Sequence, residues 1–306
     1  MNSVTKIITI LGPTAVGKTK FASQLALKFN GEIISADSRQ VYIGMDIGTG
    51  KDLEDYIIDG INIPYHLINI INPQYEFSLF QFQDFFHAAL KKIKQNKHLP
   101  FLVGGTALYL NSILQNYNLV KVNFEDKKYK LLNNQDIEEL KKILYKLNPK
   151  LHNKTDLLDR ERLIKAIIIN NSQKNENKII KENIMSLNIG IIEDREKLKQ
   201  RIKDRLMKRL KEGMIDETKK LLDSGLSHEK LRYFGLEYKF LSLYLSGELN
   251  YNDMYQKLAS AIIQFSKRQM TWFRKMEREG VLINWVKNTE LEKAETLINN
   301  FLANKK

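Results

Sequence analysis

The first third of the chain alternates short apolar runs with longer stretches that have apolar residues at helical spacing. The apolar runs have strand length and cover residues 6–11, 31–37, 62–71 and 99–103. The helical stretches cover residues 20–30, 77–96 and 107–114. Strands that alternate with helices in this order predict an α/β fold with a doubly wound parallel sheet flanked by helices.

A block without glycine interrupts this alternation. No glycine occurs between Gly105 and Gly190, and charged residues and asparagines dominate the block. Residues 135–147 and 160–171 have helical spacing, and strand alternation is missing from the block. We therefore predict a helical insertion domain at residues 119–186. It lies between two parts of one core domain, at residues 1–118 and 187–306.

The last third of the chain is mostly helical. Strand character returns at residues 187–193. Helical spacing then covers residues 194–211, 213–224, 236–246 and 251–276, and an apolar run at 281–285 precedes a terminal helix. The second part of the core is thus expected to add one or two strands and a group of helices.

The stretch from Gly12 to Thr19 lies between the first predicted strand and the first predicted helix. It matches G-x-x-x-x-G-K-[ST] in the context that this phosphate-binding loop requires. Loop N–H groups and the helix start favour an anion, Lys18 adds a charge for the outer phosphate, and Thr19 offers a hydroxyl to Mg²⁺. The residues expected to bind the phosphates are Gly12, Pro13, Thr14, Ala15, Val16, Gly17, Lys18 and Thr19.

Asp37 ends the second apolar run, at the sheet edge where ligands bind in open α/β folds. Three interpretations stay open from the residues alone. The carboxylate holds the water shell of Mg²⁺, as in a kinase. It acts as a general base near the phosphate leaving group. Alternatively, it caps a helix that starts at Ser38.

Gly104, Gly105 and Thr106 end the third strand, and their small size allows a ligand to approach the backbone. Thr106 either offers its hydroxyl to the site or caps the helix that follows. Arg201 and Arg205 lie four residues apart on one predicted helix face. They either clamp a diphosphate or belong to a solvated basic face.

The charge balance favours a polyanionic partner, because the chain carries a formal net charge of +13. Lys267 and Arg268 share a helix end with Trp272 and Phe273, a mixture that suits RNA, although the two aromatic residues are expected in the core. The chain has no cysteine, which excludes disulfides and zinc thiolates. We find no signal peptide and no apolar run long enough for a membrane, so we expect a cytoplasmic protein. Nothing in the sequence demands a partner chain, so we expect a monomer.

These motifs together resemble the tRNA dimethylallyltransferases, also called tRNA isopentenyltransferases. The resemblance rests on segments in the family's order over nearly the whole chain. They are residues 12–19, Asp37-Ser38 with Tyr42, 44–49, 103–109, Arg201 with Arg205, and 267–274. It implies a P-loop NTPase-like core with a helical insertion. A small-molecule P-loop kinase and an RNA-binding protein without catalysis are the alternatives.

The resemblance also implies the reaction. Family members transfer a dimethylallyl group from dimethylallyl diphosphate to N6 of the adenosine 3′ of the tRNA anticodon. By this match Lys18, Thr19 and Arg205 bind the diphosphate with Mg²⁺. Asp37 acts as general base, and Thr106 helps to hold donor and acceptor in line. The match implies tRNA contacts at Asp37, Ser38, Arg39, Gln40, Glu161, Arg162, Leu163, Ile164, Lys165, Arg232, Tyr233, Phe234, Gly235, Leu236 and Glu237.

The chain departs from the family pattern at three positions. Leu236 and Glu237 stand where the family usually has tyrosine and a basic residue, and Ile263 replaces an arginine. We expect these differences to affect contacts to the tRNA anticodon stem-loop rather than the chemistry.

Overall fold

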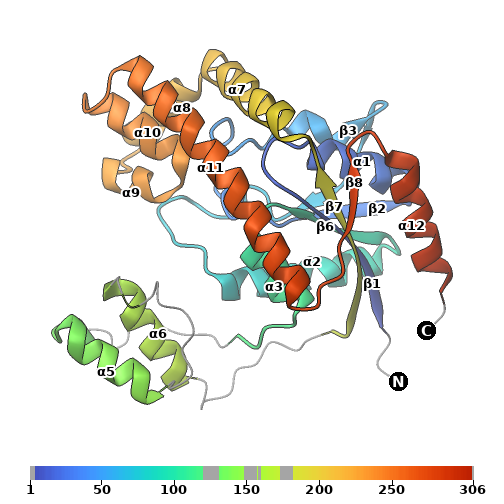
Figure 1. Cartoon of the computed structure of the whole chain (residues 1–306), viewed down its shortest axis with the longest axis horizontal. Helices are drawn as coiled ribbons and strands as arrows, with labels where there is room; N and C mark the ends of the chain where they lie inside the picture. The colour runs from blue at the N-terminus through green and yellow to red at the C-terminus, as the bar shows by residue number, and fades with distance from the viewer. Residues whose placement is uncertain (1–3, 120–130, 148–156, 158–159, 173–181, 305–306) are drawn as a thin grey trace. The chain divides into compact units, whose positions relative to one another are not determined.

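A computed structural model of the chain describes residues 4–119, 131–147, 157, 160–172 and 182–304 (Figure 1). The chain divides into two compact units. One consists of residues 1–116 with 182–306, and the other of residues 117–181. The boundaries predicted from the sequence fall at 118/119 and 186/187.

The large unit contains a six-stranded sheet in which every neighbouring pair is parallel. Its strand order is β5-β2-β6-β1-β7-β8. The strands are β1 (Thr5–Leu11), β2 (Gly31–Ser35), β5 (Tyr65–His66), β6 (Leu99–Gly104), β7 (Ile184–Ile192) and β8 (Asn284–Lys287). The predicted α/β fold class, a parallel sheet flanked by helices, is confirmed.

Three strands differ from their predicted positions. The run predicted at residues 62–71 adds only the two-residue β5 to the sheet, while Asn62 belongs to a separate strand pair. β7 begins at Ile184, which pairs with Thr5 of β1, so its first residues lie inside the segment that the sequence assigned to the insertion. β8 begins at Asn284 rather than at Val281. The reason is that Val281 and Ile283 are buried in the core before the chain joins the sheet.

Helices cover both faces of the sheet because apolar residues of β1 alternate between them. Ile7 and Leu11 pack with α2 (Leu79–Gln95) and α3 (Ala107–Leu114). Ile8 and Ile10 pack on the other face with α1 (Lys18–Lys28) and α12 (Leu291–Ala303). A short helical turn η1 (Leu53–Tyr56) and an antiparallel pair, β3 (Ile57–Ile58) and β4 (Ile61–Asn62), lie beside α1.

A group of helices follows β7. They are α7 (Arg195–Lys211), α8 (Met214–Asp223), α9 (His228–Tyr233), α10 (Leu236–Leu245) and α11 (Tyr251–Arg278). α7, α8, α10 and α11 share a core that includes Ile202, Met214, Leu241 and Leu258. α11 runs from this group to the sheet, where Phe273 packs with α2 and α3 (Figure 1). None of the described helices is both long and apolar enough to cross a membrane.

The small unit contains α5 (Ile137–Leu147) and α6 (Arg160–Ser172) in its described part. The two helices pack through leucine and isoleucine side chains. These include Leu140, Leu144, Leu163, Ile164, Ile167 and Ile168.

Candidate active site

The candidate site lies where three neighbouring strands end. β2, β6 and β1 are adjacent in the sheet, and Leu11 pairs with Gly104 while Ser35 pairs with Val103. The carboxyl ends of parallel strands meet at one edge, so the phosphate-binding loop, residues 104–106 and Asp37 come together. They line one cavity of about 820 Å³ within the large unit.

The phosphate-binding loop has a backbone that requires its glycines. Gly12 has a φ of +151°, and a Cβ there would lie 2.5 Å from the carbonyl oxygen of Ile191. Gly17 has a φ of +90° and precedes the first residue of α1. The ammonium of Lys18 donates a hydrogen bond to the carbonyl oxygen of Pro13 at 2.7 Å. The loop therefore presents a helix N-terminus and a lysine to the cavity.

Electrostatics of the phosphate-binding loop favour an anion. Burial, followed by the charge of Arg205, lowers the pKa of Lys18 to about 7. Burial, followed by the charge of Arg209, lowers the pKa of Arg205 to about 10. Arg205 also donates a hydrogen bond from Nη2 to the hydroxyl of Thr14. Because a bound anion would relieve this repulsion among cations, the site suits a diphosphate.

Other arginines of α7 border the same cavity. Arg201 forms an ion pair with Glu193 at 3.2 Å, and Arg209 with Asp52 at 3.1 Å. Arg201 and Arg205 both line the cavity, so the structure places them together on the phosphate side.

A carboxylate and a hydroxyl lie close to the ends of the neighbouring strands β2 and β6, and both line the cavity. Oδ1 of Asp37 accepts a hydrogen bond from the N–H of Arg39 at 2.9 Å, and no hydrogen bond reaches Oδ2 from the residues that the structure describes. Thr106 occupies the N-cap position of α3, but its hydroxyl does not cap the helix. It accepts a hydrogen bond from the N–H of Ser38 at 3.0 Å instead.

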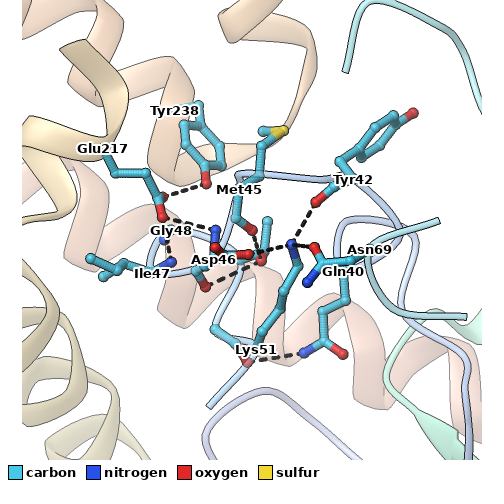
Figure 2. Close-up of polar contacts among 12 residues, drawn as sticks. Gln40, Tyr42, Met45, Asp46, Ile47, Gly48, Lys51, Asn69, Glu217 and Tyr238 are labelled. Carbon is cyan, nitrogen blue, oxygen red and sulfur yellow. Dashed lines mark hydrogen bonds and ion pairs between the residues drawn. The ribbon is translucent and has the colours of Figure 1, made fainter. Parts of the chain in front are cut away.

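The loop between β2 and η1 is held in place by Glu217 of α8. Its carboxylate accepts hydrogen bonds from three successive N–H groups, those of Asp46 at 2.8 Å, Ile47 at 2.7 Å and Gly48 at 3.0 Å (Figure 2). The hydroxyl of Tyr238 donates to the same carboxylate at 2.7 Å. Successive N–H groups form an anion-binding concavity, which is filled here by a side chain of the chain itself.

The buried side chain of Lys51 also stabilises this loop by hydrogen bonds. Its ammonium donates to the carbonyl oxygen of Tyr42, to Asp46 at 2.6 Å and to the side-chain oxygen of Asn69 (Figure 2). The residue is 2% exposed. Burial lowers its pKa, and the hydrogen bond and charge of Asp46 oppose that effect.

Gly50 belongs to the same loop and lines the cavity. Its carbonyl oxygen accepts a hydrogen bond from the side chain of Gln40 at 2.9 Å, and Gln40 in turn accepts one from the hydroxyl of Ser35 at 3.0 Å. Gly50 has a φ of +67°, and a Cβ there would lie 1.8 Å from Nη2 of Arg209. This wall therefore depends on glycine at position 50.

The residues expected to contact tRNA fall into three groups. The first lines the cavity with Asp37 and contains Ser38, Arg39, Gln40, Phe234, Gly235, Leu236, Glu237 and Arg268. The second is exposed outside the cavity lining and contains Arg232, Tyr233 and Lys267. The third lies on α6 in the small unit and contains Glu161, Arg162, Leu163, Ile164 and Lys165.

Two predicted tRNA contacts on α6 need correction. Leu163 and Ile164 are buried in the core of the small unit, with 0% and 1% exposure, so their side chains are not available at the surface. Glu161 and Lys165 lie one helical turn apart and form an ion pair at 2.6 Å.

Trp272 was predicted in the core, and this prediction was wrong. Its side chain is 40% exposed and lines the cavity, with the Lys275 ammonium 4.7 Å from its ring centroid. Phe265, two helical turns earlier on α11, is also 40% exposed and lines the cavity. Phe273 is fully buried as expected. Two exposed aromatic side chains thus border the cavity. In the sequence they have the helical spacing of core residues, which is why Trp272 was misplaced.

Comparison with known proteins identifies the family. A family model described as IPP transferase matches residues 40–276. The chain belongs to the IPP transferase family. IPP transferase relatives include tRNA dimethylallyltransferase 1 of Azobacteroides pseudotrichonymphae, which is 50% identical over 96% of this chain and 97% of the relative. tRNA dimethylallyltransferase 2 of Phocaeicola vulgatus is 49% identical over 92% of each chain.

Solved structures of IPP transferases have the same fold. The full-length tRNA isopentenylpyrophosphate transferase of Bacillus halodurans has 34% sequence identity and a TM-score of 0.69, covering 97% of this chain and 95% of its own. The corresponding enzyme of Staphylococcus epidermidis has 29% identity and a TM-score of 0.67, covering 97% and 99%. Both matches cover more of this chain than residues 40–276, which the family model matches.

Proposed function

We propose that this chain is a tRNA dimethylallyltransferase. It transfers the dimethylallyl group of dimethylallyl diphosphate to N6 of the adenosine 3′ of the anticodon. The observation that carries the proposal is the pairing of an anion-binding loop with Asp37 across one cavity at adjacent strand ends. The relatives named tRNA dimethylallyltransferase, at about half identity over nearly the full chain, support the same assignment.

The phosphate side of the cavity receives the donor. Loop N–H groups of residues 15–19, the ammonium of Lys18 and the guanidinium of Arg205 surround the diphosphate. When the bond between the allylic carbon and the diphosphate oxygen breaks, negative charge grows on the leaving group. Fixed donors and cations stabilise that charge without reorganising, which is the largest contribution that such a site makes.

The acceptor side receives the adenine. The nitrogen N6 forms a bond to the allylic carbon and loses one proton. Asp37 accepts this proton, because its Oδ1 is already held by the N–H of Arg39 and its Oδ2 is left for the substrate. Thr106 holds the N–H of Ser38 and so fixes the backbone beside Asp37.

The residues present fit Mg²⁺ as a cofactor. The cavity contains the hydroxyl of Thr19 and the carboxylates of Asp37, Asp52 and Asp55. The described residues contain no preformed group of three or more metal-binding side chains. Mg²⁺ commonly binds through one or two protein oxygens with water and substrate phosphates, so Thr19 would hold it beside the diphosphate. When bound, it neutralises charge on the leaving group.

The macromolecular substrate enters over a basic and aromatic border. Arg39 lies 5.8 Å from the ring centroid of Tyr233, and Arg268 lies 6.0 Å from that of Phe265. Basic and aromatic side chains suit an unstacked base and its phosphates. We also propose that the enzyme acts as a monomer in the cytoplasm.

The variant Asp37→Asn tests the role of the base. It keeps the acceptor for the N–H of Arg39 but removes the proton acceptor, so the transfer rate should fall by about 100-fold or more. The dissociation constant for tRNA should stay within a few-fold. The assay incubates enzyme, dimethylallyl diphosphate and bulk tRNA, and detects isopentenyladenosine by mass spectrometry after digestion.

Asp223→Asn is the matched control, because this aspartate is exposed at the end of α8 and does not line the cavity. It should transfer at the parent rate. A parent enzyme that consumes ATP and yields no prenylated base would contradict the function. Full activity of Asp37→Asn would contradict only the role of Asp37.

A further inference from the structure

The side chain of Gln269 on α11 joins two segments of the cavity wall. It is buried, with 6% exposure, and uses both ends of its amide. Oε1 accepts a hydrogen bond from the N–H of Thr14 at 2.8 Å, and Nε2 donates one to the carbonyl oxygen of Gly105 at 2.9 Å. Thr14 belongs to the phosphate-binding loop and Gly105 precedes Thr106. One side chain therefore contacts both the donor side and the acceptor side.

Beyond the sheet this amide is the hydrogen-bonded bridge between the two segments. β1 and β6 pair as far as Leu11 and Gly104, and the chain then leaves the sheet on both strands. In the part of the chain that the structure describes, no hydrogen bond joins residues 13–19 directly to Gly105 or Thr106. The separation of these segments at the cavity thus depends on Gln269.

Close packing defines the orientation of the amide. A Cβ at Gly105 would lie 2.5 Å from Nε2 of Gln269, so glycine is needed for this approach. The N–H of Thr14 only donates and the carbonyl of Gly105 only accepts, which fixes which end of the amide faces each. An apolar replacement would leave both backbone groups unpaired.

Each end of the bridge continues to a group that the proposed reaction uses. On the donor side, the hydroxyl of Thr14 accepts a hydrogen bond from Arg205. On the acceptor side, the residue after Gly105 is Thr106, whose hydroxyl holds the N–H of Ser38 next to Asp37. The amide therefore connects the diphosphate cradle with the carboxylate through two short hydrogen-bonded paths.

Building on the function proposed above, we propose that Gln269 is a positioning residue that aligns the allylic carbon with the adenine amine. It makes and breaks no bond in the reaction: the carbon–oxygen bond to the diphosphate breaks, the carbon–N6 bond forms, and Asp37 takes the N6 proton. A misplacement of about 1 Å between reacting groups costs roughly 100-fold in rate. Loss of the bridge should thus slow the chemical step while each substrate still binds to its own side.

Gln269→Met tests this with little change in side-chain size and no added charge. In single-turnover experiments with saturating dimethylallyl diphosphate and tRNA, its rate constant should fall by about 30- to 100-fold. The KM for dimethylallyl diphosphate and the dissociation constant for tRNA should stay within about three-fold of the parent. Measurements are made well below the melting temperature of each variant.

Ser266→Ala is the matched control. Ser266 lies one turn earlier on the same buried face of α11, is 5% exposed, and donates its hydrogen bond within the helix to the carbonyl oxygen of Ile263 at 2.8 Å. It should keep the parent rate constant, although it also loses a buried hydrogen bond. An equal loss of rate in Ser266→Ala and Gln269→Met would overturn the positioning role.

Gln269→Glu provides a second readout that does not depend on the stability of the methionine variant. An ionised carboxylate accepts from Thr14 but cannot donate to Gly105, whereas a protonated carboxyl group does both. The rate of Gln269→Glu relative to the parent should therefore rise as the pH falls. The ratio is compared at each pH because Asp37, Lys18 and Arg205 face the same cavity in both proteins.

The outcomes separate this inference from the proposed function. If the parent yields no prenylated adenosine, the function is wrong and the bridge has no reaction to align. If the parent is active, an unchanged rate constant in Gln269→Met overturns the inference, as does a higher KM with an unchanged rate constant. A flat pH ratio for Gln269→Glu also overturns it.

Discussion

Replacing Lys51 by methionine should destabilise the large unit measurably, although Lys51 is one of 49 basic residues. The ammonium donates to three oxygens, and its side chain is 1% exposed (Figure 2). Methionine has a similar length and fills the same space without a donor. The variant therefore removes the hydrogen bonds and leaves the packing nearly intact.

The magnitude follows from the three acceptors. The carbonyl oxygen of Tyr42 is buried and loses its donor, which costs about 1–3 kcal/mol. The side chain of Asp46 is 54% exposed and Asn69 is exposed, so both oxygens regain water at little cost. The buried ammonium no longer has to be desolvated, which offsets part of the loss. We expect a net loss of about 2 kcal/mol in the free energy of unfolding.

For a unit of this size such a loss lowers the melting temperature by about 4–8 °C. Differential scanning calorimetry measures the shift. Native-state hydrogen exchange tests its location, because the N–H groups of Ile47 and Gly48 should exchange faster if the loop opens locally. Both are bonded to Glu217, which the substitution does not touch.

Lys219→Met is the control, because Lys219 pairs with Asp216 at 3.2 Å on the surface of α8 and its side chain is 55% exposed. Surface pairs contribute little, so its melting temperature should stay within about 1 °C of the parent. Equal melting temperatures for Lys51→Met and Lys219→Met would refute the reasoning. An unchanged exchange rate of the loop with a lower melting temperature would refute its local part.

Two predictions concern pH. Burial lowers the pKa of Lys18 to about 7, so its charge opposes folding fully below pH 7 and less as the pH rises toward its unfolded value. Without diphosphate, Lys18→Met should therefore raise the melting temperature more at pH 6 than at pH 9 by scanning fluorimetry, and an equal gain would contradict this. Burial raises the pKa of Glu32, but hydrogen bonds from Asn96, His66 and His98 outweigh it and the net pKa is lowered. Its stabilisation is present above pH 4.5 and is lost as the pH falls through the native pKa. Glu32→Gln should thus cost about 1–3 kcal/mol in urea unfolding at pH 7 and less near pH 4; a constant cost would contradict the linkage.

The centre of the site could be predicted because it depends on local sequence and one topological rule. The phosphate-binding loop, Asp37 and Thr106 each follow an apolar run directly, and the ends of parallel strands meet at one edge. The pattern also fixed the class of ligand, since glycines, a lysine and a helix start in that order bind phosphate. The role of Thr106 was less accessible, because a hydroxyl at an N-cap position usually caps its own helix, whereas here it holds Ser38.

The supporting residues could not be predicted because their roles depend on distant packing. Gln269 is 255 residues from Thr14, and Glu217 is 169 residues from Gly48, so no local pattern connects them. Trp272 was predicted in the wrong environment for a different reason. A long amphipathic helix gives every apolar residue the appearance of a core residue, but α11 passes the cavity before it reaches the sheet. Only the three-dimensional path of the helix distinguishes these positions.

The neutral character of the bridge at Gln269 follows from the charges on each side of it. Burial, followed by the charge of Arg205, already lowers the pKa of Lys18, so a cation at position 269 would add to this cost. A carboxylate there would repel the diphosphate and oppose the charge that grows on the leaving group. An amide supplies one donor and one acceptor without a net charge. It can therefore hold the donor and acceptor segments together while the field in the cavity remains set by the cations on one side and Asp37 on the other.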